Sequence, residues 1–326
     1  MAKTALVLCG GGSRAAFAVG ALKYIHSQRS PIQFDIFCGT GTSAIIASLA
    51  ALGEINLLEK LFTSNSTADL LNTSTLLQRF PNSNSLYNTT AFIQKISNIF
   101  TDARFNALKE SEKEVLIATM GLQTNQITYF TPNEIPVKKG QNIHQTRQIT
   151  AFRQAVLAAC SAPVFMPPVE INSQQYFTGG GQLYKPIEMA IERGATSIYL
   201  IQLTPVTSSN KQVFFQDLID ILERQIDLNT VSINEADIST LQLQNKALKY
   251  ISAVKANLEN NGISASDVNK YFEIPENPFE EKLPVDLQII RPEKALAAAL
   301  GGLEFSPPVM KEMLEYGQQI AQKILG

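Results

Sequence analysis

The chain has 326 residues, of which 45% are hydrophobic and 17% are charged, and its net charge at pH 7 is −2. This length suits one large α/β domain or two small ones, and the composition indicates a globular protein rather than a disordered one. A near-neutral charge without a basic stripe excludes the electrostatic surface of a nucleic-acid binder. The sequence holds only two histidines, His26 and His144, far apart in the chain, which excludes a histidine-rich metal site.

The three cysteines, Cys9, Cys38 and Cys160, are too few for a disulfide framework in a chain of this length. We therefore expect reduced, buried thiols in a cytoplasmic protein. The apolar run at 5–9 ends in glycines and is too short for a secretory leader. The longest apolar run, at 44–52, is too short to span a bilayer, so we expect no transmembrane segment, while peripheral membrane contact remains open.

Short apolar runs alternate with helical patterns along the chain. A helix is expected at 13–27, and a second one at 44–52 is apolar nearly all round, which predicts burial on all sides. This alternation predicts an α/β fold with a mostly parallel sheet covered by helices on both faces. The expected strands are 5–9, 34–38, 115–120, 127–131, 169–171, 175–177, 198–203 and 287–290.

Two helical regions are additions to this sheet. Residues 55–112 are polar and rich in Asn, Ser and Thr, and residues 212–274 carry apolar side chains at helical spacing. We expect both regions to be flanking helices, although either would also serve to cap an active site. The prediction is a single domain over 1–326, with its core at about 1–54 and 113–205, a helical insert at about 55–112 and a C-terminal helical region at about 206–326.

A first glycine-rich loop follows the first expected strand. It contains Gly10, Gly11 and Gly12, and Arg14 lies at the start of the next helix. Glycines let backbone N–H groups converge beside the positive end of a helix, which suits a phosphate or an oxyanion. A loose dinucleotide-binding pattern is also present, but Asp35 opens the second strand, whereas that motif places an acid at its end. An oxyanion site is the favoured interpretation, in which Arg14 either holds the loop or binds the anion.

A second glycine-rich loop follows the second expected strand. Its sequence is Gly39-Thr40-Gly41-Thr42-Ser43, and a helix follows at once. A strand, a sharp turn and a helix with the pattern Gly-x-Ser-x-Gly would present an exposed nucleophile. Two such loops on neighbouring strands predict an anion-binding cradle that faces this sharp turn, which we call the elbow.

These two loops and several later segments resemble the bacterial patatin-like phospholipases. The resemblance covers nearly the whole chain and implies a three-layer α/β/α fold with a central, mostly parallel sheet and helical additions. It implies neither a metal nor an organic cofactor. The further matching segments are Ala51-Leu52-Gly53-Glu54, Ser85-Leu86-Tyr87-Asn88, Ile117-Ala118-Thr119, Tyr129-Phe130, residues 155–168, Tyr176-Phe177-Thr178-Gly179-Gly180, Ile290-Arg291-Pro292 and the last helix.

The catalytic dyad of that family is what this sequence lacks. The family hydrolyses acyl esters of lipids with a serine at the elbow and an aspartate that activates it. The resemblance implies that Gly41 occupies the serine position and that Thr178, before Gly179 and Gly180, occupies the aspartate position. Glycine has no nucleophile, and threonine cannot accept a proton near neutral pH as a carboxylate does. The resemblance therefore implies an acyl- or lipid-binding pseudoenzyme.

An active acyl hydrolase or acyltransferase of altered mechanism is the main alternative. Ser43 would be its nucleophile in a shifted frame, but two residues along a helix is a rotation of about 200°, so Ser43 should face away from the cradle. A hydroxyl in the first helical turn is the simpler interpretation of Ser43. The hydroxyls of Thr40, Thr42 and Thr178 are near the site, but each lacks a visible base.

The expected ligand is the carboxylate, thioester or phosphate end of an acyl compound, such as an acyl lipid, a fatty acid or an acyl thioester. A further alternative is a protein-interaction module that keeps only the fold and uses the helices of 55–112 or 212–274 to bind a protein partner or a second copy. A last alternative is that one or both substitutions at the dyad positions were engineered to trap a substrate.

Overall fold

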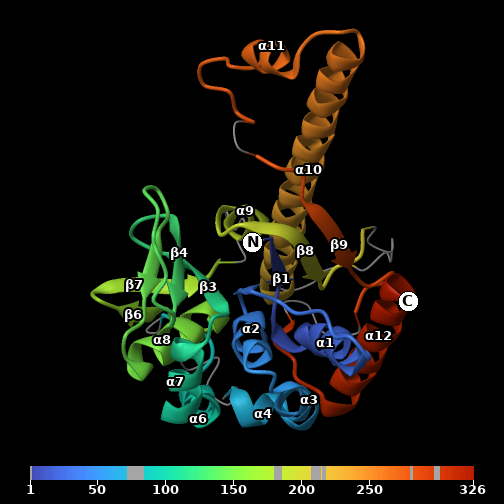
Figure 1. Cartoon of the computed structure of the whole chain (residues 1–326). Helices are drawn as coiled ribbons and strands as arrows, with labels where there is room; N and C mark the ends of the chain where they lie inside the picture. Colours follow the sequence, from blue (N-terminus) through green and yellow to red (C-terminus); the bar gives the residue numbers. More distant parts are fainter. Residues whose placement is uncertain are drawn as a thin grey trace.

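The computed structural model describes residues 2–71, 84–179, 186–206, 214, 218–279, 282–296 and 302–326. In this part of the chain, a nine-stranded sheet lies between two layers of helices (Figure 1). The predicted α/β fold with a largely parallel sheet and helices on both faces is confirmed.

The strands follow the order β5-β4-β3-β2-β1-β8-β9, with β7 pairing β3 and β6. Five pairs are parallel (β1–β2, β1–β8, β2–β3, β8–β9 and β4–β5), whereas β3–β4, β3–β7 and β6–β7 are antiparallel. The bounds are β1 Lys3–Cys9, β2 Ile36–Gly39, β3 Glu114–Gly121, β4 Gln126–Thr131, β5 Ile143–Gln145, β6 Val169–Ile171, β7 Gln174–Thr178, β8 Ala195–Gln202 and β9 Asp286–Ile290.

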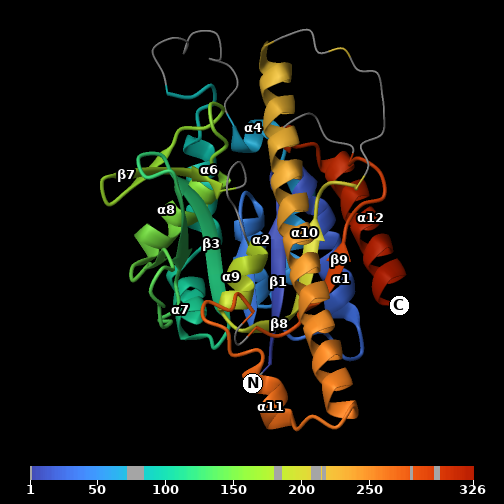
Figure 2. The same cartoon turned by 90° about the horizontal axis from the view of Figure 1, so that it is seen from above.

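The helices form two layers because side chains alternate between the faces of each strand. In β1, Leu6 and Leu8 pack in one core with residues of α1, α2, α8 and α12, while Ala5 and Val7 pack in the other with residues of α9 and α10. Figure 2 shows these helices around β1 from above. As predicted, every residue of α2 is buried. The bounds are η1 Gly12–Ala15 (a 3-10 turn), α1 Ala16–Ser27, α2 Ser43–Ala51, α3 Ile55–Ser64, α4 Thr67–Leu70, α6 Thr90–Ile99, α7 Asp102–Glu110, α8 Ile149–Cys160, α9 Pro186–Glu192, α10 Leu218–Asn260, α11 Ala265–Lys270 and α12 Pro307–Leu325.

Two strands, β2 and β7, pair with the same edge of β3 one after the other, and this arrangement positions the site. β2 ends at Gly39, which pairs with Ile117 of β3. Two residues further along β3, Thr119 pairs with Thr178 of β7. Because β4 occupies the opposite edge of β3 over the same stretch, β7 takes over the edge that β2 leaves. The chain leaving β2 therefore turns directly beside Thr178.

The C-terminal helical region contains the longest helix among the described residues. α10 has 43 residues, and its C-terminal half projects with α11 beyond the sheet (Figure 1). Among the helices that the structure describes, α10 included, none combines the length and the apolar character that crossing a membrane requires.

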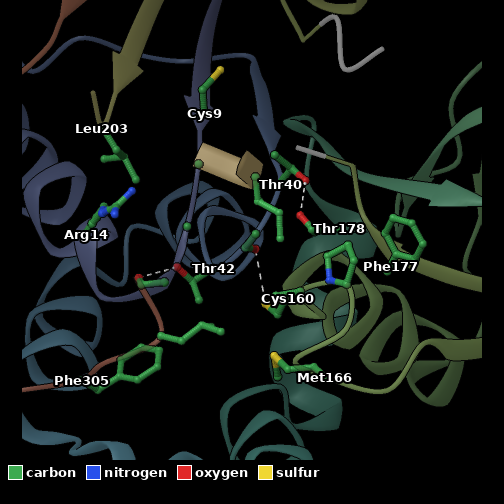
Figure 3. A pocket seen from close by; sticks show the side chains of 18 of the residues that line it. Cys9, Arg14, Thr40, Thr42, Cys160, Met166, Phe177, Thr178, Leu203 and Phe305 are labelled. Atoms are coloured by element: carbon green, nitrogen blue, oxygen red, sulfur yellow. Dashed lines mark hydrogen bonds between the residues drawn. The ribbon is translucent and has the colours of Figure 1, made fainter. Parts of the chain in front are cut away.

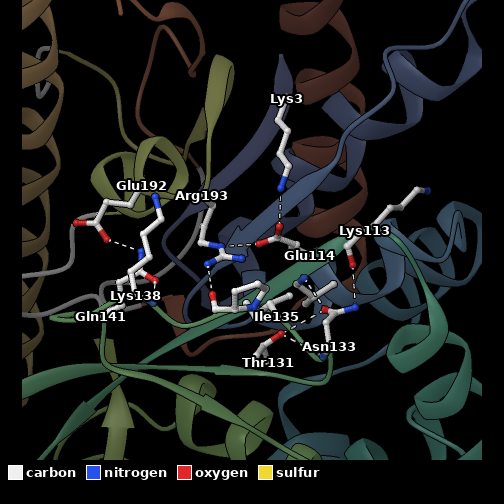
Figure 4. A network of polar contacts seen from close by, with 12 residues as sticks. Lys3, Lys113, Glu114, Thr131, Asn133, Ile135, Lys138, Gln141, Glu192 and Arg193 are labelled. Atoms are coloured by element: carbon white, nitrogen blue, oxygen red, sulfur yellow. Dashed lines mark hydrogen bonds and ion pairs between the residues drawn. The ribbon is translucent and has the colours of Figure 1, made fainter. Parts of the chain in front are cut away.

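A buried ion-pair network joins three elements at the amino end of the sheet (Figure 4). The Glu114 carboxylate lies 2.6 Å from Lys3 Nζ and 2.7 Å from Arg193 Nε. Arg193 also donates to the carbonyl oxygen of Pro136 at 2.6 Å. Burial raises the pKa of Glu114, but the hydrogen bonds from Arg193 and Lys3 outweigh burial and hold this pKa below its ordinary value.

We expect Glu114→Gln to lower the free energy of unfolding at pH 7 by about 2 kcal/mol, because the buried Arg193 guanidinium loses its counter-charge. A folded-state pKa below the unfolded value of about 4.3 means that the carboxylate stabilises the fold above that pH. This stabilisation is lost as the pH falls through the folded-state pKa. Urea unfolding at pH 7 and at about pH 3.5 should therefore show a smaller difference between the two proteins at the lower pH.

The matched control is Glu112→Gln, which changes an exposed carboxylate two residues away and should alter the free energy of unfolding by less than about 0.5 kcal/mol. An equal loss for Glu114→Gln at both pH values would contradict an electrostatic role for this carboxylate.

Candidate functional site

A cavity of about 340 Å³ lies at the carboxyl ends of β1, β2 and β8 (Figure 3). In parallel sheets this end is the usual place for a ligand, at the point where strand order reverses. Here the order reverses at β1, which lies between β2 and β8. The wall is mostly apolar and includes Cys9, Leu70, Leu71, Phe92, Cys160, Ala162, Pro163, Met166, Phe177, Leu203, Ile226, Leu303 and Phe305; the polar lining residues are Arg14, Thr40, Thr42, Thr178, Gln202, Thr204 and Asn229.

The first glycine loop forms one side of the cavity, and its shape requires glycine. Gly10 and Gly12 have φ values of +99° and +66°, in the left-handed region that disfavours other residues. A Cβ atom on Gly12 would lie 2.1 Å from the carbonyl oxygen of Gly302. A Cβ atom on Gly11 would lie 2.7 Å from the backbone nitrogen of Thr42. The loop is therefore held between the elbow and the segment before α12.

The elbow packs directly against this loop. Gly41 has a φ of +64°, and a Cβ atom there would lie 3.0 Å from Gly11 Cα and 3.2 Å from the Gly10 oxygen. The Thr42 hydroxyl donates to the carbonyl oxygen of Gly12 at 2.9 Å. The two glycine loops predicted to face each other do so, with their backbones in contact.

The start of α2 makes the turn tight. A Cβ atom on Gly39 would lie 2.4 Å from the carbonyl oxygen of Ser43, so the turn leaves no room for a side chain there. Ser43 itself is fully buried, and its hydroxyl has no hydrogen-bond partner among the described residues. It is not among the residues that line the cavity.

A pair of threonine hydroxyls joins the elbow to the end of β7. Thr40 Oγ1 lies 3.3 Å from Thr178 Oγ1 and donates to the carbonyl oxygen of Ala118 at 3.1 Å. Thr40 Oγ1 also accepts a hydrogen bond from the Gly179 nitrogen at 3.2 Å. When the single Thr40 proton points to Ala118, Thr178 is the donor within the pair. This arrangement holds the β7 end against the elbow but supplies no proton acceptor comparable to a carboxylate.

Arg14 is the single charged residue among the described residues that line the cavity. It lies in η1, directly after the first glycine loop, and is half-buried. In the same lining set there is no Asp, Glu or His. His26 is exposed on α1, and His144 lies on β5, where its ring contacts Phe130. A guanidinium in an apolar cavity favours an anionic ligand group.

Two of the buried cysteines, Cys9 and Cys160, line the cavity. The Cys160 thiol donates to the carbonyl oxygen of Gly41 at 3.3 Å. Burial raises the pKa of Cys9 and of Cys160, and it raises the pKa of Cys38 to about 12 with a smaller contribution from Glu114. A thiol that stays protonated at neutral pH is a poor nucleophile, so Cys9 and Cys160 act as apolar wall.

The structure gathers most of the predicted site residues at one cavity. Gly10, Gly11, Gly12, Arg14, Thr40, Gly41, Thr42 and Thr178 all line it. Gly39 and Gly179 lie next to lining residues, and Gly180 lies outside the described residues. Sequence reasoning did not identify Leu303 and Phe305, which follow β9, or Ile226 and Asn229 of α10. Glycines before Leu303 in the sequence indicate a turn there, and Gly302 has a left-handed φ of +70° in the structure.

The chain is similar to known proteins in sequence and in structure. A model described as patatin-like phospholipase matches residues 6–191. The crystal structure of VipD from Legionella pneumophila is similar with a TM-score of 0.47 and 12% sequence identity, covering 100% of this chain and 67% of that chain. A search of curated proteins gave no match.

Proposed function

This chain belongs to the patatin-like phospholipase family, and we propose that it binds an acyl compound on that scaffold without hydrolysing it. The observation that carries the proposal is the chemistry of the cavity wall. Among the described residues the wall is mostly apolar, with one cation, Arg14, and no carboxylate or imidazole. Such a wall fits an acyl chain with a polar end, but it offers no general base for ester hydrolysis.

We assign the two dyad positions of the family to Gly41 and Thr178. Gly41 has a positive φ in a sharp strand-to-helix turn, the kind of turn in which a nucleophile is presented in related hydrolase architectures. The Thr178 hydroxyl lies across the elbow, 3.3 Å from the hydroxyl of Thr40. Neither residue supplies the group that ester cleavage needs, which supports binding without turnover.

The polar end of the ligand is proposed to lie against the first glycine loop and Arg14. The carboxylate of a fatty acid, the carbonyl of an acyl thioester or the phosphate of a lipid would accept hydrogen bonds from this loop. Arg14, which lies directly after the loop and lines the cavity, would supply the positive charge. The three buried, free cysteines support a cytoplasmic location as part of the proposal.

Arg14→Gln should weaken the binding of palmitate about tenfold or more, because a charge-assisted hydrogen bond contributes about 1.5–3 kcal/mol. Arg14→Lys should fall between the native protein and Arg14→Gln, because lysine keeps the charge but loses the planar fork. Isothermal titration of each purified protein with palmitate measures these differences. Arg29→Gln, which changes an exposed arginine beyond the end of α1, is the control and should leave the affinity unchanged.

Lipid mass spectrometry of protein purified under native conditions is the complementary experiment. The proposal predicts a co-purified acyl compound with its ester, thioester or carboxylate intact. Finding no acyl ligand, together with no binding of palmitate or of a palmitoyl thioester in titration, would reject the proposal.

A further inference from the structure

A second, smaller cavity of about 40 Å³ adjoins the first one. The two cavities share the wall residues Thr42, Leu70, Phe92 and Phe305. The shared wall comes from the elbow, α4, α6 and the segment before α12. A ligand in the main cavity therefore meets the second cavity beyond the elbow, between α2, α3, α6 and α12.

Apart from Thr42, which it shares with the first cavity, the second cavity is lined by apolar side chains with two exceptions. Asn65 is one exception, but its side-chain nitrogen already donates to the carbonyl oxygen of Leu61 at 2.6 Å. Lys95 is the other; it is half-buried on α6, and its long methylene stem can cover apolar surface while the ammonium reaches water. The residues that line only this cavity are Ile45, Leu61, Phe62, Asn65, Lys95, Ile99 and Met310.

The wall that the two cavities share is apolar as well, apart from the hydroxyl of Thr42. The Thr42 hydroxyl is engaged by the carbonyl oxygen of Gly12 at 2.9 Å, which leaves its methyl group for other contacts. Leu70 and Phe92, which are buried, and Phe305, which is half-buried, supply the other shared surface. A hydrocarbon chain would cross here without stripping water from an unpaired polar group.

We propose that the second cavity holds the far end of the acyl chain, so that the protein selects long chains over short ones. This inference rests on the proposed function, because it needs the polar end of the ligand at the first glycine loop and Arg14. With the polar end fixed there, the methylenes at the far end of a long chain are the ones that would occupy the second cavity. Each methylene buried there should raise the affinity about fourfold, which corresponds to about 0.8 kcal/mol per CH₂ group.

The test compares laurate with palmitate, a shorter and a longer saturated fatty acid, by isothermal titration. The native protein should prefer palmitate by about tenfold or more, because two or more methylenes enter the second cavity. Leu61→Trp fills this cavity from α3, so the preference should fall to about twofold or less while the affinity for laurate stays unchanged. The matched control is Leu57→Trp, one turn earlier on α3, half-buried and lining neither cavity; it should keep the native preference.

Lys95→Trp fills the same cavity from the surface of α6 and replaces Leu61→Trp if that variant does not fold. A native preference in both filling variants would overturn the chain-length proposal and leave the proposed function standing. Equal affinities of the native protein for laurate and palmitate would also overturn the chain-length proposal and leave the proposed function standing. If the native protein binds neither fatty acid, both proposals fall.

Discussion

The double variant Gly41→Ser plus Thr178→Asp should hydrolyse a short-chain p-nitrophenyl ester at least about 100-fold faster than the native chain. The glycine loop and the elbow already face each other, so the variant adds a nucleophile and a base to an existing binding site. Gly41→Ser alone and Thr178→Asp alone should each stay near the native rate. The first variant has a nucleophile without a base, the second has a base without a nucleophile, and catalysis requires both. Initial rates at several ester concentrations separate this gain from background hydrolysis.

The double variant should also have a lower free energy of unfolding than the native protein. A serine at a φ of +64° carries a backbone strain of about 1–3 kcal/mol. Its Cβ atom would also lie 3.0 Å from Gly11 Cα, so the loop must shift by a few tenths of an ångström. Gly53→Ala is the matched control, because Gly53 has a φ of +73° but no atom within 4 Å of an added Cβ.

Native turnover with saturating kinetics would contradict the assignment of Gly41 as a vacated position. In that case Ser43 becomes the first residue to substitute, despite its burial. A folded double variant with no gain in rate would contradict the assignment of Thr178 as the base position.

Gly20→Ala should lower the free energy of unfolding by about 3 kcal/mol or more, the upper end of the range for overpacking. Gly20 lies where α1 crosses α12, and a Cβ atom there would lie 1.8 Å from the carbonyl oxygen of Leu314. On the other helix, a Cβ atom on Gly317 would lie 2.0 Å from the oxygen of Phe17. Alanine favours a helix over glycine by about 1 kcal/mol, so the steric contact decides the sign.

Urea unfolding of Gly20→Ala measures this loss. Gln319→Ala changes an exposed position of α12 and should stay within about 0.5 kcal/mol of the native protein. Because η1 and the first glycine loop lead directly into α1, palmitate binding should weaken along with stability in Gly20→Ala. A variant as stable as the native protein would mean that α1 and α12 are not held backbone to backbone.

The strands and the elbow could be predicted because their signals are local. Buried parallel strands such as β1 are continuous apolar runs, and glycines end β1 and β2 sharply. The all-apolar pattern of α2 predicted its burial on every side, and every residue of that helix is buried. The sequence prediction contains no strand at β5, because this three-residue edge strand carries the polar residues His144 and Gln145.

The remaining parts of the site depend on long-range contacts that no local pattern encodes. Thr67 and Phe305 exchange backbone and side-chain hydrogen bonds, which bring α4 and the segment before α12 together at the cavity. The meeting of Thr40 and Thr178 depends on β7 replacing β2 along one edge of β3. The resemblance to a family supplied the correspondence of Thr178, whereas its partner at the elbow came from the structure.

Native mass spectrometry distinguishes a chain that binds an acyl compound intact from one that cleaves it. The protein is incubated with palmitoyl lysophosphatidic acid, which carries both an acyl ester and a phosphate, and the mass of the complex is followed over time. We expect a one-to-one complex with the intact ester and no covalent adduct. Release of palmitate at a catalytic rate, or an acyl group attached to the protein, would show that the chain cleaves its ligand.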